Sequence, residues 1–329
     1  MSADLRNRIF KINSRKAFQE TALEVFNFQA DNNPLYNEFI YNLGIKPEYV
    51  RTPEKIPFLP IELFRNHKVV TGTSPAEAVF ESSGTTSITT SRHYVTDLGI
   101  YKESFFTGFR YFYGDPREYF FAGLLPSHIE RRNSSLVYMV DRLINTSSDL
   151  HSGFFIDEIE NMITALQTVK NEKRKGILIG ISFALLDLAE KHSPDLSGIT
   201  VVETGGMKGR RKEITRGELH SILKNGLNIN SVHSEYGMTE LLSQAWSKGD
   251  GLFYCPPWMK IIIRDAADPL SILENYAETG GINIIDLANL NSCSFIATND
   301  LGKLYEDGAF EVLGRFDSSD IRGCNLMVE

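Results

Sequence analysis

Cysteine is scarce in this chain of 329 residues, which has three in all: Cys255, Cys293 and Cys324. They form an odd set without CxxC spacing, which argues against both a disulfide framework and a zinc site. The seven histidines show no HExxH or similar ligand spacing. The small, odd number of cysteines favours a reducing cytoplasm as the compartment of the protein.

Long hydrophobic runs are missing too. The most apolar stretches, residues 176–188 and 259–263, are broken by charge or end well before the roughly 18 apolar residues of a membrane span. The first residues, MSADLRNRIFKINSRK, lack the apolar segment of a secretory signal. We expect a cytoplasmic protein without stable membrane insertion.

The chain also has no excess of positive charge. Lys and Arg number 34 against 42 Asp and Glu, a net charge of −8. This balance argues against nucleic-acid binding driven by bulk charge, although residues 208–212 (KGRRK) form a local basic stretch. Hydrophobic content of 42% and charged content of 23% are ordinary for a globular protein long enough to have more than one lobe.

The first 250 residues predict an α/β body. Residues 15–29 have apolar spacing typical of an amphipathic helix, and prolines then break the chain, so that IPFLPIELFRNHKVV should approach a short strand irregularly. From about residue 118 strands and helices alternate, which predicts mainly parallel sheets flanked by helices. The expected strands are EYFFAGLLP, GILIGIS, GITVVETGG and NINSVHSEYG; the helices are NMITALQTVKNEK, FALLDLAEKH and RKEITRGELHSILKNG, the last closed by Gly226 as its C-cap.

Residues 251–329 have a different sequence pattern, in which no helix-like segments alternate with the strands. KIIIRD, GGINIIDL, CSFIATNDLGKLYED and AFEVLGRFD read as short strands with Gly, Asn and Asp turns between them. We expect a β-rich and antiparallel C-terminal lobe, packed into one body with residues 1–250.

The segment ESSGTTSITTSRH, from Glu81 to His93, is rich in small hydroxyl residues around a glycine. Backbone N–H groups and hydroxyls in such a loop can surround phosphate oxygens. It lacks the GxxxxGK[ST] pattern, so it is not a P-loop. A polar surface loop is the alternative.

The segment VVETGGMKGRRKE predicts a strand leading into Gly205 and Gly206, where backbone can approach a flat ligand such as a base. A tight turn from strand to helix explains the same glycines. Lys208 and its basic neighbours would face phosphates or solvent.

The segment SEYGMTELLSQAW falls at the carboxyl end of an expected parallel strand, where ligands collect in open α/β sheets. Tyr236 can stack on a base, Thr239 can donate to a phosphate, and Glu240 can bind a hard cation such as Mg²⁺. The alternative is an N-capped helix with Thr239 and Glu240 in its first turn.

The segment ATNDLGKLYEDGAFEVLGRFDSSDIRG carries Asp300, a carboxylate that can accept both hydroxyls of a ribose, and Arg315, which can join it as a donor. Two hairpin turns are the alternative interpretation.

Together and in this order the segments resemble the adenylate-forming superfamily, which includes acyl-CoA synthetases, luciferases and nonribosomal adenylation domains. SSGTT resembles its phosphate loop, ETGGMK its adenine-side turn and EYGMTE its Tyr-Gly-x-Thr-Glu motif. ATNDLG resembles its Thr-Gly-Asp-Leu motif, with Asn299 in place of the glycine, and GRFDSSDIRG its Gly-Arg-x-Asp hinge. The resemblance runs from about Pro57 onward.

This resemblance implies the fold of the superfamily's large N-terminal domain, ATP as substrate and Mg²⁺ as cofactor. It implies Thr239 and Glu240 as catalytic residues, with Glu240 also the metal ligand. The implied nucleotide-binding residues are Ser82, Ser83, Gly84, Thr85, Thr86, Gly205, Gly206, Met207, Lys208, Tyr236, Gly237, Met238, Asp300 and Arg315.

Two departures from the superfamily pattern matter. The phosphate loop normally continues Gly-x-Pro-Lys, whereas Ser87-Ile88-Thr89-Thr90 stands here, which leaves Arg92 or Lys208 to neutralise phosphate. A small C-terminal domain with an adenylation lysine normally follows the hinge, whereas this sequence has a short tail containing Cys324.

With that tail, the chain resembles the acyl-protein synthetases of the bacterial luminescence fatty-acid reductase complex (LuxE-type). The resemblance rests on IPFLPIELFR, SSGTT, TGGMKG, EYGMTELLSQAW, CPPW and GRFDSSDIRGC. It implies that a carboxylic acid, expected to be a fatty acid, is adenylated and that the acyl group passes to Cys324 and then to a partner reductase. A thiolate is a strong nucleophile, and positive charge such as that of Arg322 favours it.

Other interpretations stay open at this stage. The acyl group could pass to CoA or to a carrier protein, with Cys324 incidental, or the chain could be a non-catalytic subunit that binds nucleotide. Cys255 and Cys293 read as packed interior residues. Core packing is also the better interpretation of the aromatic residues Phe120, Phe121 and Tyr138, which would otherwise line an acyl pocket, and His128 is either a pocket or a surface residue.

Overall fold

The computed structural model describes residues 2–82, 90–126, 131, 133–205, 211 and 214–316. Its α-helices are α1 (Ser2–Ile9), α2 (Arg15–Asn32), α3 (Pro34–Asn42), α4 (Leu63–Asn66), α5 (Leu98–Tyr113), α6 (Ser135–Thr146), α7 (Ile159–Asn171), α8 (Ser182–Lys191) and α9 (Arg216–Leu227). Short 3₁₀ helices are η1 (Pro47–Tyr49), η2 (Pro53–Lys55), η3 (Pro116–Glu118) and η4 (Leu287–Asn289). The strands are β1 (Leu59–Pro60), β2 (Ala78–Glu81), β3 (Arg92–Val95), β4 (Tyr119–Leu124), β5 (Gly153–Phe154), β6 (Lys175–Ile181), β7 (Thr200–Thr204), β8 (His233–Tyr236), β9 (Ala245–Ser247), β10 (Phe253–Tyr254), β11 (Met259–Arg264), β12 (Gly280–Asp286), β13 (Phe295–Leu304) and β14 (Phe310–Arg315).

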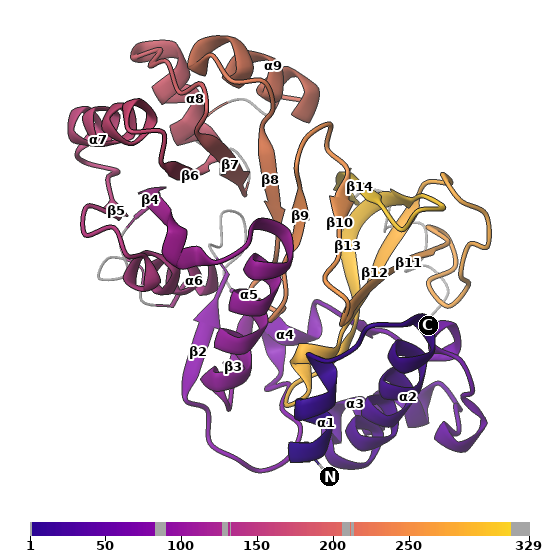
Figure 1. Ribbon diagram of the computed structural model, residues 1–329. Coiled ribbons are helices and arrows are strands. Elements are labelled where there is room, and N and C mark those ends of the chain that lie inside the picture. The colour runs from indigo at the N-terminus through magenta and orange to yellow at the C-terminus, as the bar shows by residue number, and fades with distance from the viewer. Residues whose placement is uncertain are drawn as a thin grey trace.

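In the described part of the chain the strands form one 12-stranded sheet and a separate hairpin of β2 and β3 (Figure 1). Parallel pairing joins β5, β4, β6, β7 and β8. Antiparallel pairing continues through β9, β10, β14, β13, β12 and β11. The α/β fold class is confirmed, and so is the antiparallel pairing of the last strands. The division at residue 250 stays a prediction; strand pairing continues across it from β9 to β10.

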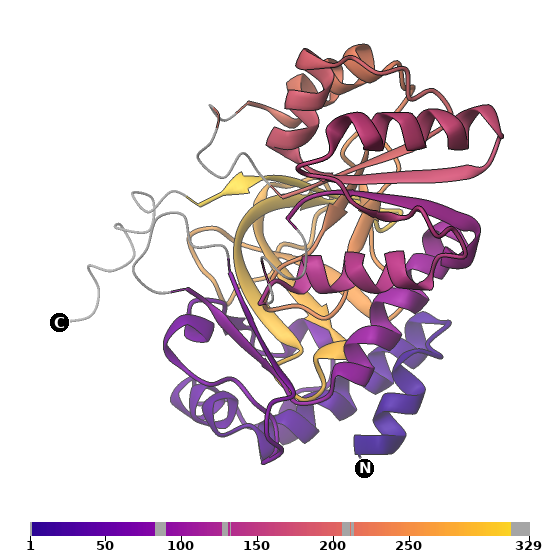
Figure 2. The same cartoon turned by 90° about the vertical axis from the view of Figure 1, so that its left-hand side faces the viewer.

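The parallel layer is buried because helices cover both of its faces. β4 and β6 are nearly continuous apolar runs, as expected for strands without a solvent-facing side. Helices α7, α8 and α9 lie on one side of this layer, and α5 and α6 lie on the other (Figure 2). Within the described residues, no helix combines the length and apolar character needed to cross a membrane.

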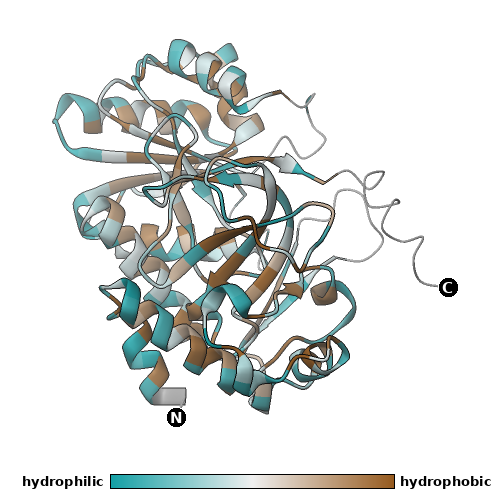
Figure 3. Cartoon of the chain, turned by 90° about the vertical axis from the view of Figure 1, so that its right-hand side faces the viewer, coloured by the Kyte–Doolittle hydropathy of each residue, from teal (hydrophilic) through white to brown (hydrophobic). Residues whose placement is uncertain are grey.

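The N-terminal helices cover the β-rich layer. Helix α2 begins at its N-cap Ser14, whose hydroxyl accepts from the N–H of Ala17 at 3.2 Å, and its apolar face is buried as the spacing predicts. Phe26 of α2 and Tyr36 of α3 pack against Phe295 of β13, with ring centroids 6.1 and 6.2 Å apart. Figure 3 shows the hydrophobic residues gathered on these inner strands, with polar residues on the outer helix surfaces.

The predicted C-cap of α9 was wrong. The helix runs past Gly226 to Leu227, and Asn228 adopts the left-handed conformation that ends it, with φ 52° and ψ 49°. Asn accepts this conformation more readily than most residues. Gly226 instead lies against α8, where a Cβ would stand 2.8 Å from the carbonyl oxygen of Ala189.

The segment IPFLPIELFRNHKVV forms an irregular approach to a short strand, as predicted, and a short helix follows that strand. Leu59 and Pro60 pair with Ile296 and Ala297 of β13 in parallel, which is the whole of β1. The chain then forms α4, a single turn that buries Phe64. Phe64 packs edge-on against His93 of β3, with ring centroids 5.9 Å apart.

Candidate active site

The segment after β8 forms turns, not a helix. Residues 237–244 connect β8 directly to β9, so the alternative of an N-capped helix starting near Thr239 was wrong. The N–H groups of Leu242 and Ser243, which a helix would pair with backbone carbonyls, instead donate to the buried carboxylate of Asp286 at 2.8 and 2.9 Å. Asn289 donates to the carbonyl of Glu240 at 2.7 Å. The roles of Asp286 and Asn289 could not be predicted from the sequence, because nothing in GINIIDLANL indicates a hydrogen-bond partner more than 40 residues upstream.

The last residues of β8 and β14 meet at Asp300, which lies in the middle of β13. The hydroxyl of Tyr236 donates to Asp300 Oδ2 at 2.8 Å, and Nε of Arg315 lies 3.3 Å from Asp300 Oδ1. Asp300 is buried, whereas the side chain of Arg315 is 78% exposed. The structure therefore brings together three residues that the sequence pattern placed in two separate segments.

The ring of Tyr236 is buried as well. It packs edge-on against Phe253 and Phe310, with centroids 5.9 and 5.6 Å away. Burial, with Asp300 beside it, raises the pKa of the Tyr236 hydroxyl. Stacking of this ring on a base stays a prediction.

Glu240 lies beside the base of the hydroxyl-rich loop, where Ser82 and Ser91 pair with each other; we call this pair the neck of the loop. The N–H of Ser82 donates to the carbonyl of Ser91 at 3.1 Å, and the N–H of Ser91 donates to Ser82 Oγ at 3.0 Å, which closes the neck. The Ser91 hydroxyl also donates to the buried carboxylate of Glu240, whose pKa is nevertheless raised by burial. Residues Ser83, Gly84, Thr85 and Thr86, which the sequence predicts to bind phosphate, lie outside the described residues.

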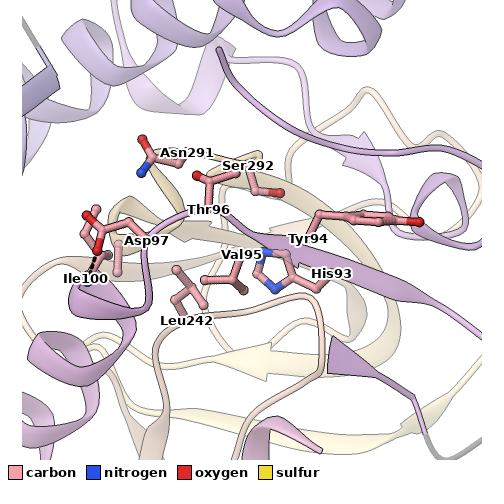
Figure 4. A pocket seen from close by; sticks show the side chains of 10 residues that line it. His93, Tyr94, Val95, Thr96, Asp97, Ile100, Leu242, Asn291 and Ser292 are labelled. Carbon is pink, nitrogen blue, oxygen red and sulfur yellow. Dashed lines mark hydrogen bonds between the residues drawn. The ribbon is translucent and has the colours of Figure 1, made fainter. Parts of the chain in front are cut away.

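His93 fixes the turn that carries Thr239 and Glu240. Its Nδ1 is 2.9 Å from the carbonyl oxygen of Thr239, and burial lowers the pKa of His93 to about 4. The ring is therefore neutral at pH 7 and donates through Nδ1 to that carbonyl. Figure 4 shows His93 beside Leu242 at a cavity of about 10 Å³, which is a packing gap too small for a ligand.

The remaining residues predicted in this turn differ in exposure. Gly237 is exposed, and Met238 and Thr239 are partly buried. A Cβ on Gly237 would stand 2.3 Å from Oε1 of Glu235, so a larger residue at this position would displace the end of that side chain.

The end of β7 is held by α8. The hydroxyl of Ser182 donates to the carbonyl of Gly205 at 2.5 Å, and Gly205 has φ 72°, a conformation that favours glycine. Gly206, Met207 and Lys208 lie outside the described residues. Arg92, the other candidate for phosphate neutralisation, is paired with Glu81 at 3.4 Å and is half exposed.

Glu235 is a site residue that sequence analysis missed. Its Oε2 accepts from the hydroxyl of Thr204 at 2.6 Å, at the carboxyl ends of β7 and β8. Burial raises the pKa of Glu235 to about 7. An acidic residue directly before the Tyr-Gly of the motif, at the carboxyl end of a strand predicted to be parallel, was the available signal.

Cys324 lies outside the described residues, as does His128. Cys293 is fully buried and burial raises its pKa to about 12, and Cys255 is partly buried, in agreement with their prediction as packed interior residues. Phe120 and Phe121 are fully buried in the core, and Tyr138 stacks on Tyr101 with centroids 5.8 Å apart. Two cavities in the described residues, the one beside His93 and a larger one lined by residues 45–58 and 260–276, are not lined by any of these three aromatic side chains.

No family model and no curated protein matches the chain. Several solved structures are similar to it in fold. ATP-bound MatB from Rhodopseudomonas palustris has a TM-score of 0.54 at 15% identity, over 72% of this chain and 48% of MatB. An ATP-bound RpMatB-BxBclM chimera has a TM-score of 0.54 at 15% identity, over 75% and 49%. A double mutant of o-succinylbenzoate CoA synthetase (MenE) from Bacillus subtilis, bound to the product analogue OSB-NCoA, has a TM-score of 0.50 at 19% identity, over 72% and 48%. The chain thus spans about half the length of these proteins, and its fold resembles the large N-terminal domain of adenylate-forming enzymes.

Proposed function

We propose that this chain uses ATP to activate a carboxylic acid, of which a fatty acid is the leading candidate. A carboxylate oxygen of the acid attacks the α-phosphorus of ATP and forms a new P–O bond. The bond from that phosphorus to the bridging oxygen breaks, and pyrophosphate leaves with the electron pair. The product is a mixed anhydride, acyl-AMP, whose leaving group is far better than the oxide of a free carboxylate.

The observation that carries this proposal is the meeting of three distant segments at one place. Asp300 is held by Tyr236 and Arg315, and Glu240 stands at the neck closed by Ser82. A buried, oriented carboxylate is suited to accept the two hydroxyls of a ribose. An exposed guanidinium beside it adds a donor for the same nucleotide.

Glu240 fits a magnesium ligand. Mg²⁺ binds proteins through one or two carboxylates and completes its coordination with phosphate oxygens and water. Within the described residues no group of three or more acidic, His or Cys side chains forms a metal site by itself, which suits an ion that arrives with the nucleotide. When bound, Mg²⁺ neutralises phosphate charge and polarises the bond that breaks. The hydroxyl of Thr239, on the same turn, would donate to a phosphate oxygen.

The acyl group then passes to Cys324, in our proposal. The thiolate sulfur attacks the carbonyl carbon of acyl-AMP, a C–S bond forms, the bond from that carbon to the AMP oxygen breaks, and AMP leaves. The thiol proton is lost to solvent before the attack. The thioester keeps the acyl group reactive for a partner reductase.

Pyrophosphate exchange tests the first step. With ATP, Mg²⁺ and a panel of carboxylic acids, we expect exchange that depends on the acid. The substitution Glu240→Gln should reduce it at least about tenfold because the metal ligand is lost. The exposed Glu48→Gln provides the matched control. Measurable ATP binding without exchange with any acid would instead favour a non-catalytic nucleotide-binding subunit.

Intact-mass analysis tests the second step. After incubation with ATP, Mg²⁺ and the acids, we expect one acyl adduct that maps to Cys324, and its mass identifies the acyl group. Cys324→Ser should abolish the adduct while exchange continues, and Cys255→Ser should change neither.

One observation favours CoA instead of Cys324 as the acceptor of the acyl group: the similar MenE structure contains a product analogue, OSB-NCoA. Formation of acyl-CoA at the wild-type rate by the Cys324→Ser variant would assign the chain to that class and remove Cys324 from the mechanism.

A further inference from the structure

A large cavity lies away from the candidate active site. Its volume is about 1060 Å³, and its walls come from residues 45–58, strand β11 and residues 269–276. Among the described residues, Tyr236, Glu240, Asp300 and Arg315 of the candidate site do not line it. The cavity is as large as the pockets that enclose small ligands.

Most of the wall is apolar, and the mouth exposes large apolar side chains. Ile56 and Ile262 are examples of the buried wall. At the mouth, Tyr49 is 71% exposed, Leu270 is 64% exposed and Tyr276 is 56% exposed. Apolar groups exposed together at the opening of an apolar cavity suit the emerging end of a hydrocarbon chain.

The polar residues of the wall favour a negatively charged ligand. They include four basic side chains, Arg15, Lys46, Lys55 and Lys260, against two acidic ones, Glu54 and Glu274. This local excess of positive charge occurs in a chain whose net charge is −8. Lys260 and Glu54 pair with each other at 2.9 Å, which leaves the excess with Arg15, Lys46 and Lys55, all exposed. Such a field attracts an anion to the cavity.

The buried end of the cavity holds an amide without a partner. Asn283 of β12 is fully buried, and its Nδ2 has no acceptor in the described part of the structure. A buried donor left in this way destabilises the fold unless something accepts from it. Its Oδ1 accepts from Nη1 of Arg264 at 3.0 Å.

Arg264 places a buried positive charge next to that amide. It is 7% exposed, and its guanidinium also donates to the carbonyls of Ile282 and Thr298 at 2.9 and 2.6 Å. These acceptors are neutral oxygens. Burial lowers the pKa of Arg264, and the carboxylates that counteract this effect, Glu62 and Asp300, do so through space and not through an ion pair.

We propose that this cavity binds a long-chain carboxylate, with its carboxyl group at Asn283 and its hydrocarbon chain along the apolar wall toward Tyr49, Leu270 and Tyr276. The carboxylate accepts from Asn283 Nδ2, and the neighbouring guanidinium compensates its charge. The site is separate from the acid-activating site and does not depend on the proposed function.

Competition binding without ATP tests the site. A bound fluorescent fatty acid, 11-(dansylamino)undecanoate, is displaced by dodecanoate or by dodecan-1-ol, which shares the chain and lacks the charge. We expect the wild type to prefer dodecanoate. Asn283→Asp keeps the size of the side chain and gives Arg264 an anionic partner, so dodecanoate should bind at least about tenfold more weakly and dodecan-1-ol unchanged. Asn145→Asp, an exposed change of the same charge, is the control.

A second variant covers the case in which Asn283→Asp misfolds. Lys46→Glu with Lys55→Glu reverses charge at exposed positions of the wall and should also weaken dodecanoate binding, whereas Lys102→Glu on α5 should not. Photolysis of a diazirine-bearing dodecanoate should label residues 45–58 and 260–276.

Three results would overturn the proposal: equal affinities in all variants, labelling confined to other residues, or a dimer in sedimentation whose interface covers the cavity. Pyrophosphate exchange of the Lys46→Glu, Lys55→Glu variant should equal that of the wild type. A wild type without exchange would contradict the proposed function and leave the cavity result standing.

Discussion

Asp300 is oriented before any ligand binds. Tyr236 donates to one oxygen of its carboxylate, and Arg315 contacts the other. The two partners come from β8 and β14, so the position of the carboxylate depends on the pairing of β13 with β14 and on the end of the parallel layer. A carboxylate held in this way binds a ligand without first losing side-chain freedom.

Asp300→Asn should weaken ATP binding. The amide keeps the size of the side chain but loses the charge that strengthens hydrogen bonds from hydroxyl groups, which are worth about 1.5–3 kcal/mol each. We expect the KM for ATP in pyrophosphate exchange to rise by about tenfold or more, with a smaller change in kcat. Asp307→Asn, an exposed carboxylate that accepts from Tyr254, is the matched control. An unchanged KM would remove Asp300 from the nucleotide site.

Glu235 makes stability depend on pH. Burial raises its pKa from 4.5 to about 7, so between these values the folded protein keeps a proton that the unfolded chain releases. The free energy of unfolding therefore falls as the pH rises through this window, by at most about 3 kcal/mol at 1.36 kcal/mol per pH unit.

Glu235→Gln should remove this loss. We expect the variant and the wild type to have similar free energies of unfolding in urea near pH 4.5, and the variant to be more stable by about 1–3 kcal/mol at pH 8. The exposed Glu48→Gln should follow the wild type at both values. Parallel pH profiles for Glu235→Gln and the wild type would show that Glu235 is ionised in the folded state.

At the scale of elements, the packing of α8 on α9 decides the role of Gly226. Helix interiors normally prefer alanine over glycine by about 1 kcal/mol. At Gly226 a Cβ would stand 2.8 Å from both the Cβ and the carbonyl oxygen of Ala189, which are backbone-fixed positions of α8. The contact therefore reverses the usual preference.

Gly226→Ala should lower the free energy of unfolding by about 1–3 kcal/mol, the range for overpacking a close contact. Gly217→Ala, at the other end of α9, has nothing within 4 Å of the new Cβ and should be neutral or stabilising by up to about 1 kcal/mol. Urea denaturation of the two variants measures both. Equal effects would mean that helix propensity alone acts at these positions.

At the scale of the whole molecule, the candidate site lies where the parallel layer meets the β-rich layer. β8 contributes Tyr236, β13 contributes Asp300, and the hairpin of β2 and β3 brings the neck of the loop beside Glu240. The nucleotide that we propose to bind here would contact all three units, so its binding should stabilise the fold as a unit.

Mg²⁺ with ATP should raise the Tm. At 100 times the Kd the added stability is about 2.7 kcal/mol, which corresponds to a rise of a few degrees for a protein of this size. Glu240→Gln should keep the response to ATP alone and lose the additional response to Mg²⁺, and Glu48→Gln should keep both. A Tm rise of equal size in Glu240→Gln would exclude this carboxylate as the metal ligand.

The elements of the parallel layer could be predicted from the sequence because local pattern and burial agree there. Strands β4 and β6 are buried on both faces, so they are nearly continuous apolar runs in the sequence. Helices α2 and α7 show helical spacing because one face of each is buried. The antiparallel strands β11–β14 could be predicted from the Gly, Asn and Asp turns between them, although β13, with 10 residues, is longer than the short strands expected there.

The features of the site that depend on contacts between distant segments could be seen only in the tertiary structure. The motif around Glu240 has helix-like spacing, but Asp286, more than 40 residues away, supplies the hydrogen bonds of a turn. The bond between Tyr236 and Asp300, the raised pKa of Glu235 and the unpartnered amide of Asn283 all arise from burial and strand register. The amino-acid sequence determined which residues could do chemistry, and long-range packing determined which of them stand together, because the environment of a buried polar group is made by segments that are distant along the chain.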